Sequence, residues 1–151
     1  MKKLLLVLML CTFAVACTEE KENNNTTIEQ TSSVNYIGTI IVGEGNDVFS
    51  EDSISIQTSK LVSGKMNIKL LQVKFAQAMP LRLDMEINGI DCVKENDGTY
   101  TLTGNNIVPI AMGGEFPTYT ITNLNGTIVD SIFDVTMTCG SYPVAYRGVS
   151  K

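Results

Sequence analysis

Residues 81–88 read LRLDMEIN, and their order favours a β-strand. Every second residue is apolar and the residues between them are charged or carry an amide. An extended chain would therefore present one dry face and one wet face. The same alternation recurs in FDVTMTC, residues 133–139. Strands of this kind are typical of antiparallel sheets.

Two interruptions of the alternation indicate β-bulges. In MNIKLLQVKF, residues 66–75, the apolar phase begins at Met66 and shifts by one residue at Leu71. A similar shift follows Ile87 at Gly89. A bulge produces a phase shift of one residue, and bulges bend strands in the way that a closing barrel requires.

About eight such strands follow one another, separated by short turns rich in Gly, Asn, Asp, Ser and Pro. We expect them at residues 34–43, 53–59, 65–76, 81–93, 100–112, 118–129, 131–139 and 142–149. No convincing helical period appears in this part of the chain. The sequence therefore predicts an all-β domain, a single antiparallel up-and-down barrel of about eight strands that leaves no exposed edge. A two-sheet sandwich is the alternative that the same strands allow.

The start of the chain has the features of a secretion signal. Lys2 and Lys3 precede an apolar run, residues 4–13, which has the length of a signal-peptide core and is too short to span a bilayer. Small residues and then Cys17 follow, in an order that resembles a bacterial lipobox. The resemblance implies cleavage after Ala16 and acylation of Cys17, whose acyl chains would contribute about 0.8 kcal/mol per buried methylene to membrane anchoring. An ordinary signal peptide that leaves Cys17 as a plain thiol is the alternative.

Residues 18–33, TEEKENNNTTIEQTSS, contain one aliphatic residue and no aromatic residue. Such a segment cannot bury enough apolar surface to offset its conformational entropy, so we expect a flexible stalk. Thr18 is not the Asp that often retains lipoproteins in the inner membrane. The acidic cluster of Glu19, Glu20 and Glu22 resembles surface-export signals of gut-dwelling Gram-negative anaerobes, although acidic residues are also common in solvated tethers.

These observations predict an outer-membrane lipoprotein that faces the periplasm or the cell surface. Its chain would divide into a signal peptide at residues 1–16, a lipidated N-terminus with its stalk at 17–33, and a barrel domain at 34–151. The membrane would then be a partner through the N-terminal acyl chains.

Composition disfavours several function classes. Loss of Lys2 and Lys3 with the signal would leave nine basic and sixteen acidic side chains, a net charge of −7. Such a chain is poorly suited to binding nucleic acid or an anionic membrane surface. The sequence contains no histidine, which removes the usual general base and most zinc sites. We expect no enzyme activity, no cofactor and no bound metal, and a hydrolase is disfavoured because no pair of nucleophile and general base is apparent.

The order of several short motifs is similar to that of the calycin-like β-barrel domains of small lipoproteins from gut anaerobes. After the lipobox and stalk come YIGTIIV at residues 36–42, a Gly-Lys-led strand from Gly64, DGTYTLTG at 97–104 and YPVAYRG at 142–148. The resemblance implies an eight-stranded, lipocalin-like barrel with no established activity, and it supplies no functional residues. The Gly-x-Trp signature of lipocalins is missing, since the chain has no tryptophan.

Cys92 and Cys139 are the cysteines that remain after the signal and the acylated position are set aside. They could form a disulfide in an oxidising compartment, or remain as buried free thiols, since both lie on the apolar phase of their strands. With eight strands, the two residues lie at opposite ends of the barrel. A split of the fifth expected strand at residues 104–106 would bring them to the same end.

Other polar residues suggest further hypotheses. Asp84 and Glu86 lie two residues apart and could act as an acid–base pair, or belong to a solvated sheet face that they share with Arg82. The acidic, Gly-rich loop at 43–52 offers oxygen ligands of the kind that calcium prefers, without the spacing of an EF-hand.

Ser53 and Ser131 each follow an Asp and precede an Ile, a pattern of O-glycosylation in some gut anaerobes and also plain turn chemistry. Both are expected at the starts of strands, where they would be exposed.

The apolar phase includes Met66, Met85, Met137 and Phe133, which could line a ligand cavity or fill the core. We therefore expect a membrane-anchored, non-enzymatic barrel that holds a small apolar or amphipathic ligand in its mouth. The alternative is a protein-interaction or inhibitor module with a filled core. A large apolar cavity would favour the first function, and a filled interior with an exposed apolar rim the second.

Overall fold

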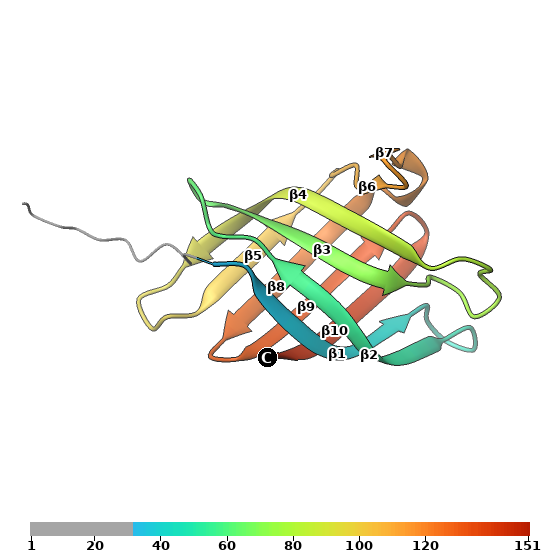
Figure 1. Ribbon diagram of the computed structural model, residues 1–151, viewed down its shortest axis with the longest axis horizontal. Helices are drawn as coiled ribbons and strands as arrows, with labels where there is room; N and C mark the ends of the chain where they lie inside the picture. Colours follow the sequence, from blue (N-terminus) through green and yellow to red (C-terminus); the bar gives the residue numbers. More distant parts are fainter. Residues whose placement is uncertain (1–31) are drawn as a thin grey trace, which may run out of the picture.

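Ten strands and one short 3-10 helix make up the part of the chain that the structure describes, residues 32–151 (Figure 1). The structure is a computed structural model. Its elements are β1 (Val34–Val42), β2 (Phe49–Thr58), β3 (Lys65–Val73), β4 (Leu83–Lys94), β5 (Tyr100–Gly104), β6 (Ile110–Ala111), β7 (Gly114–Glu115), η1 (Pro117–Tyr119), β8 (Ile121–Val129), β9 (Ile132–Cys139) and β10 (Tyr142–Ser150). The expected signal peptide, Cys17 and all but the last two residues of the expected stalk lie outside the described residues.

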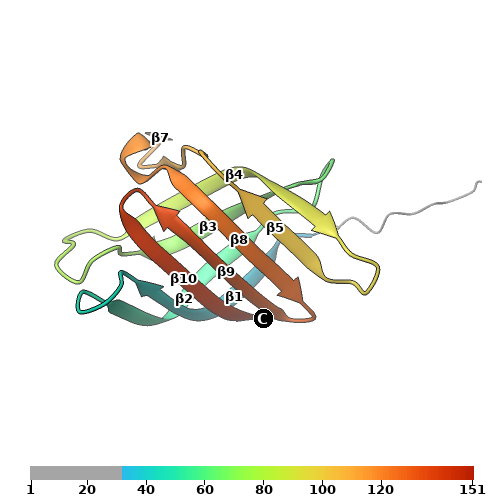
Figure 2. The same cartoon turned by 180° about the vertical axis from the view of Figure 1, so that it is seen from behind.

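Eight of the strands close into a barrel. Their order is β3-β2-β1-β10-β9-β8-β5-β4, and a further pairing of β3 with β4 completes the ring. Every pair of neighbours is antiparallel. The two opposite views show the ribbon curving round on itself (Figures 1 and 2). The predicted all-β, up-and-down barrel is thus confirmed, and the sandwich alternative is wrong.

The barrel has two ends, which we call the base and the mouth. The base carries the start of β1, the β2–β3 and β4–β5 loops, the β8–β9 turn and the C-terminus, and it lies to the left in Figure 1. The mouth carries the β1–β2 and β3–β4 loops, the β9–β10 turn and the long connection from β5 to β8, residues 105–120. The strands run alternately up and down between them.

Four of the barrel strands contain a bulge, and each bulge has one residue with a positive φ angle. These residues are Ser53 in β2, Gln72 in β3, Gly89 in β4 and Asn123 in β8, with φ of 62°, 55°, 74° and 52°. At each bulge, three residues of the bulged strand lie opposite two residues of the neighbouring strand. An extra residue of this kind increases the local twist and bend, which closure of a small barrel requires.

Two of the four bulges were predicted from the sequence, and both are confirmed. In β3 the buried phase passes from Leu70 to Val73, with Leu71 half-buried between them. In β4 it passes from Ile87 to Ile90 across Gly89.

The fifth expected strand, residues 100–112, is not continuous. β5 ends at Gly104, and Asn106 then adopts a φ of 55° that turns the chain out of the sheet. Pro109 cannot donate to a ladder, which also prevents a long strand here. The β6–β7 hairpin instead pairs beside β4 at Met85 and Glu86, beyond the stretch of β4 that β5 covers.

Some strand limits also differ from those expected. β2 begins at Phe49, before the expected start at residue 53, and β3 ends at Val73. Leu81 does not join the alternating face of β4, which begins at Leu83; its side chain is 61% exposed in the preceding loop. Pro80 immediately before it explains why pairing starts later, since proline supplies no ladder hydrogen bond.

The barrel interior is filled by side chains. Accessible surface includes the wall of any internal cavity that can admit water, so a side chain without accessible surface borders no such cavity. Inward-facing residues with 0% exposure come from seven of the eight barrel strands: Ile40, Ile56, Met66, Leu70, Val73, Met85, Ile87, Ile90, Leu102, Ile121, Phe133 and Cys139. On β10, Val144 and Tyr146 are each 3% exposed. Core filling, rather than a ligand cavity, therefore accounts for the apolar phase.

A pair of glycines makes room for the largest of these side chains. Gly38 of β1 pairs with Gly148 of β10 on one side and with Ile54 of β2 on the other. Tyr146 lies across this row, so close that a Cβ atom at Gly148 would be 2.2 Å from the tyrosine hydroxyl oxygen. The buried hydroxyl donates a hydrogen bond of 3.1 Å to the carbonyl of Ile54. Tyr146 thereby links β10 to β2 across β1.

Replacing Gly38 with alanine should destabilise the barrel. The new Cβ atom would lie 1.9 Å from the carbonyl oxygen of Arg147, and backbone must shift to relieve that contact. We expect Gly38→Ala to lose about 1–3 kcal/mol, the usual range for overpacking, as measured by urea denaturation. Gly114→Ala is the matched control, since a Cβ atom there meets nothing within 4 Å. Equal urea midpoints for Gly38→Ala and Gly114→Ala would contradict this account of the β1–β10 pair.

Candidate functional site

A gap in the barrel wall opens toward the mouth. β2 pairs with β3 only over Ser55–Thr58, so the first half of β2 follows β1 while β3 continues with β4. Figure 1 shows the β1–β2 and β3–β4 hairpins splaying apart at the right. Between them lies an open cleft of about 540 Å³, which we call the mouth cleft. Its lining consists of residues 42–44, 46–49, 75–78 and 141–143.

Aromatic rings form the floor of the mouth cleft. Phe75 is 2% exposed, and its ring centroid lies 5.0 Å from that of Tyr119 and 6.3 Å from that of Tyr142. Tyr119 stacks between Phe116 and Tyr142, at 5.1 Å and 6.1 Å. These rings come from the ends of β3 and β10 and from the segment before β8. Phe75 and Tyr142 belong to the lining of the cleft, whereas Phe116 and Tyr119 do not.

The walls of the mouth cleft are polar and acidic. Glu44 and Asp47 are the charged residues of the lining, and both belong to the β1–β2 loop. Asn46, Gln77 and Ser141 add neutral hydrogen-bonding groups, whereas Phe49 and Val48 add apolar surface. The cleft thus combines an apolar floor with a polar, negatively charged rim.

Arg82 bridges the gap beside the cleft. Its Nη2 donates to Oε1 of Glu51 on β2, and its Nη1 donates to the carbonyl of Gln72 on β3 at 2.8 Å. Glu51 raises the pKa of Arg82, so the guanidinium stays charged. Oε2 of Glu51 is buried without a hydrogen-bond partner among the described residues. Arg82 therefore holds the two hairpins together where no main-chain ladder joins them.

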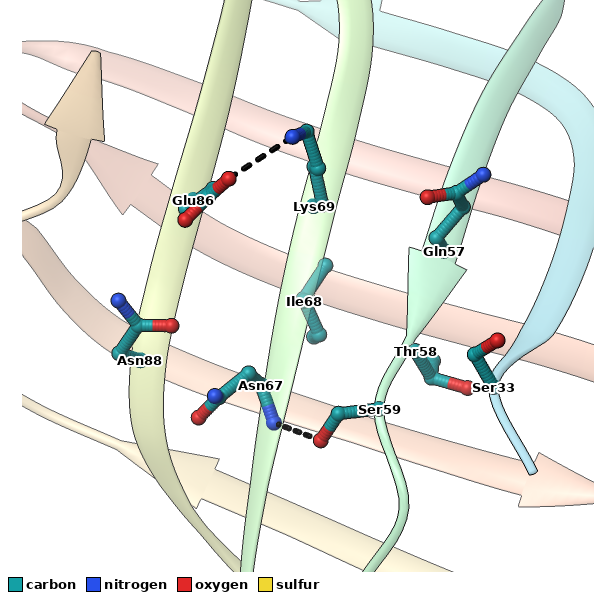
Figure 3. A pocket seen from close by; sticks show the side chains of 9 residues that line it. All are labelled: Ser33, Gln57, Thr58, Ser59, Asn67, Ile68, Lys69, Glu86 and Asn88. Carbon is teal, nitrogen blue, oxygen red and sulfur yellow. Dashed lines mark hydrogen bonds and ion pairs between the residues drawn. The ribbon is translucent and has the colours of Figure 1, made fainter. Parts of the chain in front are cut away.

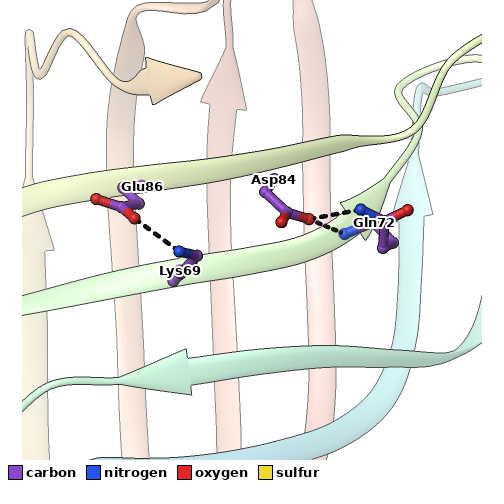
Figure 4. A network of polar contacts seen from close by, with 4 residues as sticks. All are labelled: Lys69, Gln72, Asp84 and Glu86. Atoms are coloured by element: carbon purple, nitrogen blue, oxygen red, sulfur yellow. Dashed lines mark hydrogen bonds and ion pairs between the residues drawn. The ribbon is translucent and has the colours of Figure 1, made fainter. Parts of the chain in front are cut away.

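Asp84 and Glu86 lie on the outer face of β4, and each has its own partner (Figure 4). Glu86 forms an ion pair of 2.8 Å with Lys69. Asp84 accepts hydrogen bonds from the backbone N–H and the side-chain amide of Gln72, at 2.9 and 2.8 Å. These bonds lower the pKa of Asp84. The two carboxylates do not converge on a shared site, and Asp84 instead stabilises the bulge of β3.

Removal of the Asp84 carboxylate should weaken the barrel in a pH-dependent way. The hydrogen bonds from Gln72 lower the pKa of Asp84 below its ordinary value of 3.8. The stabilisation from Asp84 is therefore complete above pH 3.8 and is lost as the pH falls through the lowered pKa. At pH 7 we expect Asp84→Ala to lose about 1 kcal/mol in urea denaturation, the net worth of a hydrogen bond. The difference in the free energy of unfolding between Asp84→Ala and wild type should vanish in strong acid.

Glu86→Ala is the control for this measurement, since it removes an exposed ion pair without touching the bulge, and such pairs contribute little. A difference between Asp84→Ala and wild type that stays constant down to pH 2 would show that the charge of Asp84 is irrelevant to the bulge.

A second, smaller recess of about 200 Å³ crosses the outer face near the base (Figure 3). It spans β2, β3 and β4, and several of its polar groups already have partners. The backbone N–H of Asn67 donates to Oγ of Ser59 at 2.9 Å, and Oδ1 of Asn67 accepts from the N–H of Gly89 at 2.8 Å. Lys69 and Glu86 are paired at its upper edge. With no aromatic wall, this recess is the weaker candidate.

Cys92 and Cys139 are buried free thiols, so the hypothesis of a disulfide between them does not hold in this structure. Sγ of Cys139 lies 3.9 Å from Sδ of Met85, near the mouth. Cys92 follows Met85 by seven residues on β4, roughly 20 Å toward the base at about 3.3 Å per residue. The fifth expected strand is split, but its second part forms the short β6–β7 hairpin and does not cross the barrel. Burial raises the pKa of Cys92 to about 11 and that of Cys139 to about 12.

The two predicted O-glycosylation residues are both exposed, as expected. Ser131 lies in the tight turn between β8 and β9. Ser53 does not start a strand, because it occupies the bulge inside β2, where Asp52 accepts a hydrogen bond of 2.6 Å from Thr39. Glycosylation of either residue stays a prediction. Cys17, the predicted lipidation site, lies outside the described residues.

The mouth cleft is the strongest candidate for a functional site. In residues 32–151 no three or more His, Cys, Asp or Glu side chains gather so that they could hold a metal ion. Within the same range no helix is long and apolar enough to cross a membrane. Comparison with protein-family models, with curated proteins and with solved structures finds no match for this chain.

Sequence patterns did not identify the aromatic residues of the cleft. Phe75 was recognised only as part of a shifted strand phase, and Tyr142 only as the start of a strand. Phe49 was expected in a loop. Their meeting depends on which strand ends become neighbours, which local alternation does not specify.

Proposed function

We propose that this protein is a non-enzymatic binding module that holds a small apolar or amphipathic ligand in the mouth cleft. The observation that carries the proposal is the 540 Å³ cleft with aromatic rings at its floor, above an interior that is already full. Small-molecule sites commonly measure about 300–1,000 Å³ and combine apolar walls with a few polar groups.

Because the core is filled, we place the ligand in the mouth cleft and not in the barrel interior. Met66, Met85 and Phe133 have no accessible surface, so a ligand could enter the barrel only by displacing packed side chains. Such displacement would forfeit the close packing that stabilises the fold. The splayed hairpins, by contrast, leave the cleft open without any rearrangement.

A non-enzymatic role fits the chemistry of the described residues. The sequence contains no histidine. Asp84 and Glu86 are occupied by Gln72 and Lys69, and the raised pKa values of Cys92 and Cys139 disfavour the reactive thiolate. We also propose that the barrel is calycin-like, since it is a closed, antiparallel barrel of eight strands.

The proposal includes an N-terminal anchor at the membrane. Acylation of Cys17 would attach the protein to the outer membrane, with the barrel facing the periplasm or the cell surface. β1 begins at the base, opposite the mouth cleft, so a tether at the N-terminus would leave the cleft pointing away from the membrane. The acidic sequence again argues against nucleic acid as a partner.

Replacing Cys17 with serine should release the protein from the membrane, because serine offers no thiol for acylation. We expect wild-type protein to sediment with membranes and to incorporate labelled palmitate when expressed in a Gram-negative host. Cys17→Ser should incorporate none, whereas Cys92→Ser, the control, should behave like wild type. Equal palmitate incorporation by Cys17→Ser and wild type would refute the anchor.

Loss of an aromatic ring at the mouth should weaken ligand binding. We expect octyl glucoside, below its micellar concentration, to shift amide NMR signals around the mouth cleft and not at the base. Tyr142→Ala should weaken this binding roughly tenfold, which corresponds to about 1.4 kcal/mol of lost ring contact. Tyr100→Ala is the control, as it removes a half-buried tyrosine near the base. Unchanged affinity in Tyr142→Ala would count against the mouth cleft as the site.

A protein-interaction module is the second candidate, and two exposed side chains favour it. Val48 on the β1–β2 loop and Leu81 on the β3–β4 loop are 52% and 61% exposed. The filled interior is one of the two features that favour this function, and these two side chains add exposed apolar surface beside the polar rim of the cleft. A cleft that binds none of a panel of small amphiphiles would favour this second function.

A further inference from the structure

We infer that the ligand of the mouth cleft is an amphipathic cation, with an ammonium group beside an apolar body. This inference rests on the proposed function and narrows it to one chemical class. It follows from the charges of the lining, the absence of partners for those charges, and the aromatic floor beneath them.

The charged groups of the lining have one sign. Glu44 and Asp47 are both acidic, and neither takes part in any of the ion pairs formed within residues 32–151. Four other carboxylates of the described barrel, Glu51, Glu86, Asp91 and Asp134, form ion pairs with a lysine or arginine. The mouth cleft is thus a place where negative charge has been left without a counterion from the protein.

Cations near the cleft do not compensate this charge. Arg82 is held by Glu51 and by the carbonyl of Gln72. Lys74 precedes Phe75 but does not line the cleft, since it alternates with the buried Val73 and Phe75 and so faces the other side. A ligand in the cleft therefore meets acidic oxygens without a competing basic side chain.

The aromatic floor favours the same ligand class. A cation is attracted to the negative face of an aromatic ring, and its apolar body gains from leaving water. The half-buried Phe49 and Tyr142 supply ring surface and the exposed Val48 supplies an apolar wall, while Phe75 and Val42 lie buried beneath them. An anionic amphiphile would gain the same apolar contacts, but it would be repelled by Glu44 and Asp47. A cleft with low-dielectric walls strengthens such discrimination by charge.

Three probes with one tail and different headgroups test this inference. Octyltrimethylammonium, octyl glucoside and octyl sulfate should be titrated, below their micellar concentrations, into residues 17–151 carrying Cys17→Ser, so that no acyl chain competes. We expect the ammonium probe to bind at least about tenfold more tightly than the glucoside, with the sulfate weakest. The preference should shrink in 0.5 M salt, where the screening length falls to a few ångströms.

A matched pair of variants locates the effect. Glu44→Gln combined with Asp47→Asn should reduce the preference for ammonium over glucoside to about twofold and leave glucoside binding unchanged. Glu95→Gln combined with Asp130→Asn makes the same change in net charge at the base and should leave the preference intact. If both double variants reduce it equally, overall charge and not the cleft selects the cation, and the inference is wrong.

The outcomes of the titrations also distinguish failure of this inference from failure of the proposed function on which it rests. Equal binding of ammonium and glucoside at the mouth would overturn the inference and leave the proposed function standing. Tightest binding of the sulfate would do the same. Failure of all three probes to bind at the mouth would overturn both.

Discussion

Closure of an eight-stranded ladder around a solid core is the constraint on which the rest of this structure depends. The pairs of β1 with β10 and of β3 with β4 complete the ring, and alternate side chains from every barrel strand then enter one shared interior. A ring of this size leaves room for side chains and little more. The row of Gly38 and Gly148, which accommodates Tyr146, illustrates how closely the interior is filled.

The same closure explains the bulges and the gap at the mouth. Extended strands must bend to form a small ring, and residues such as Ser53 and Gln72 provide that bend through positive φ angles. Where β2 and β3 diverge, the ladder ends and side chains replace it. Arg82, bound to Glu51 and Gln72, spans the opening, and Asp84 supports the bulge from the outer face.

The position of the candidate functional site depends on where the closed barrel leaves space for a ligand. The interior is occupied, and in the outer recess near the base Asn67 already bonds to Ser59 and Gly89. The mouth cleft alone, among the recesses discussed, joins aromatic rings to unpaired carboxylates. β1 begins at the opposite end of the barrel, so the proposed tether would leave the cleft facing outward.

The sequence by itself determined the local features of this protein. Alternation in residues 133–139 placed Phe133 and its neighbours inside, because the side-chain period of a strand is two. Phase shifts located the bulges at residues 66–75 and at Gly89. The lack of a helical period indicated the all-β class, and turn chemistry indicated most strand limits.

Only the tertiary structure decided which strand ends meet. After the split at Gly104, Ile110 and Ala111 pair with Glu86 and Met85 of β4, where no alternation pattern could place them. Cys92 and Cys139 came to opposite ends, and Phe49, Phe75 and Tyr142 came to one cleft. The physical reason is that periodicity reports the face on which a side chain lies, whereas ring closure, register and bulges decide which distant residue it faces.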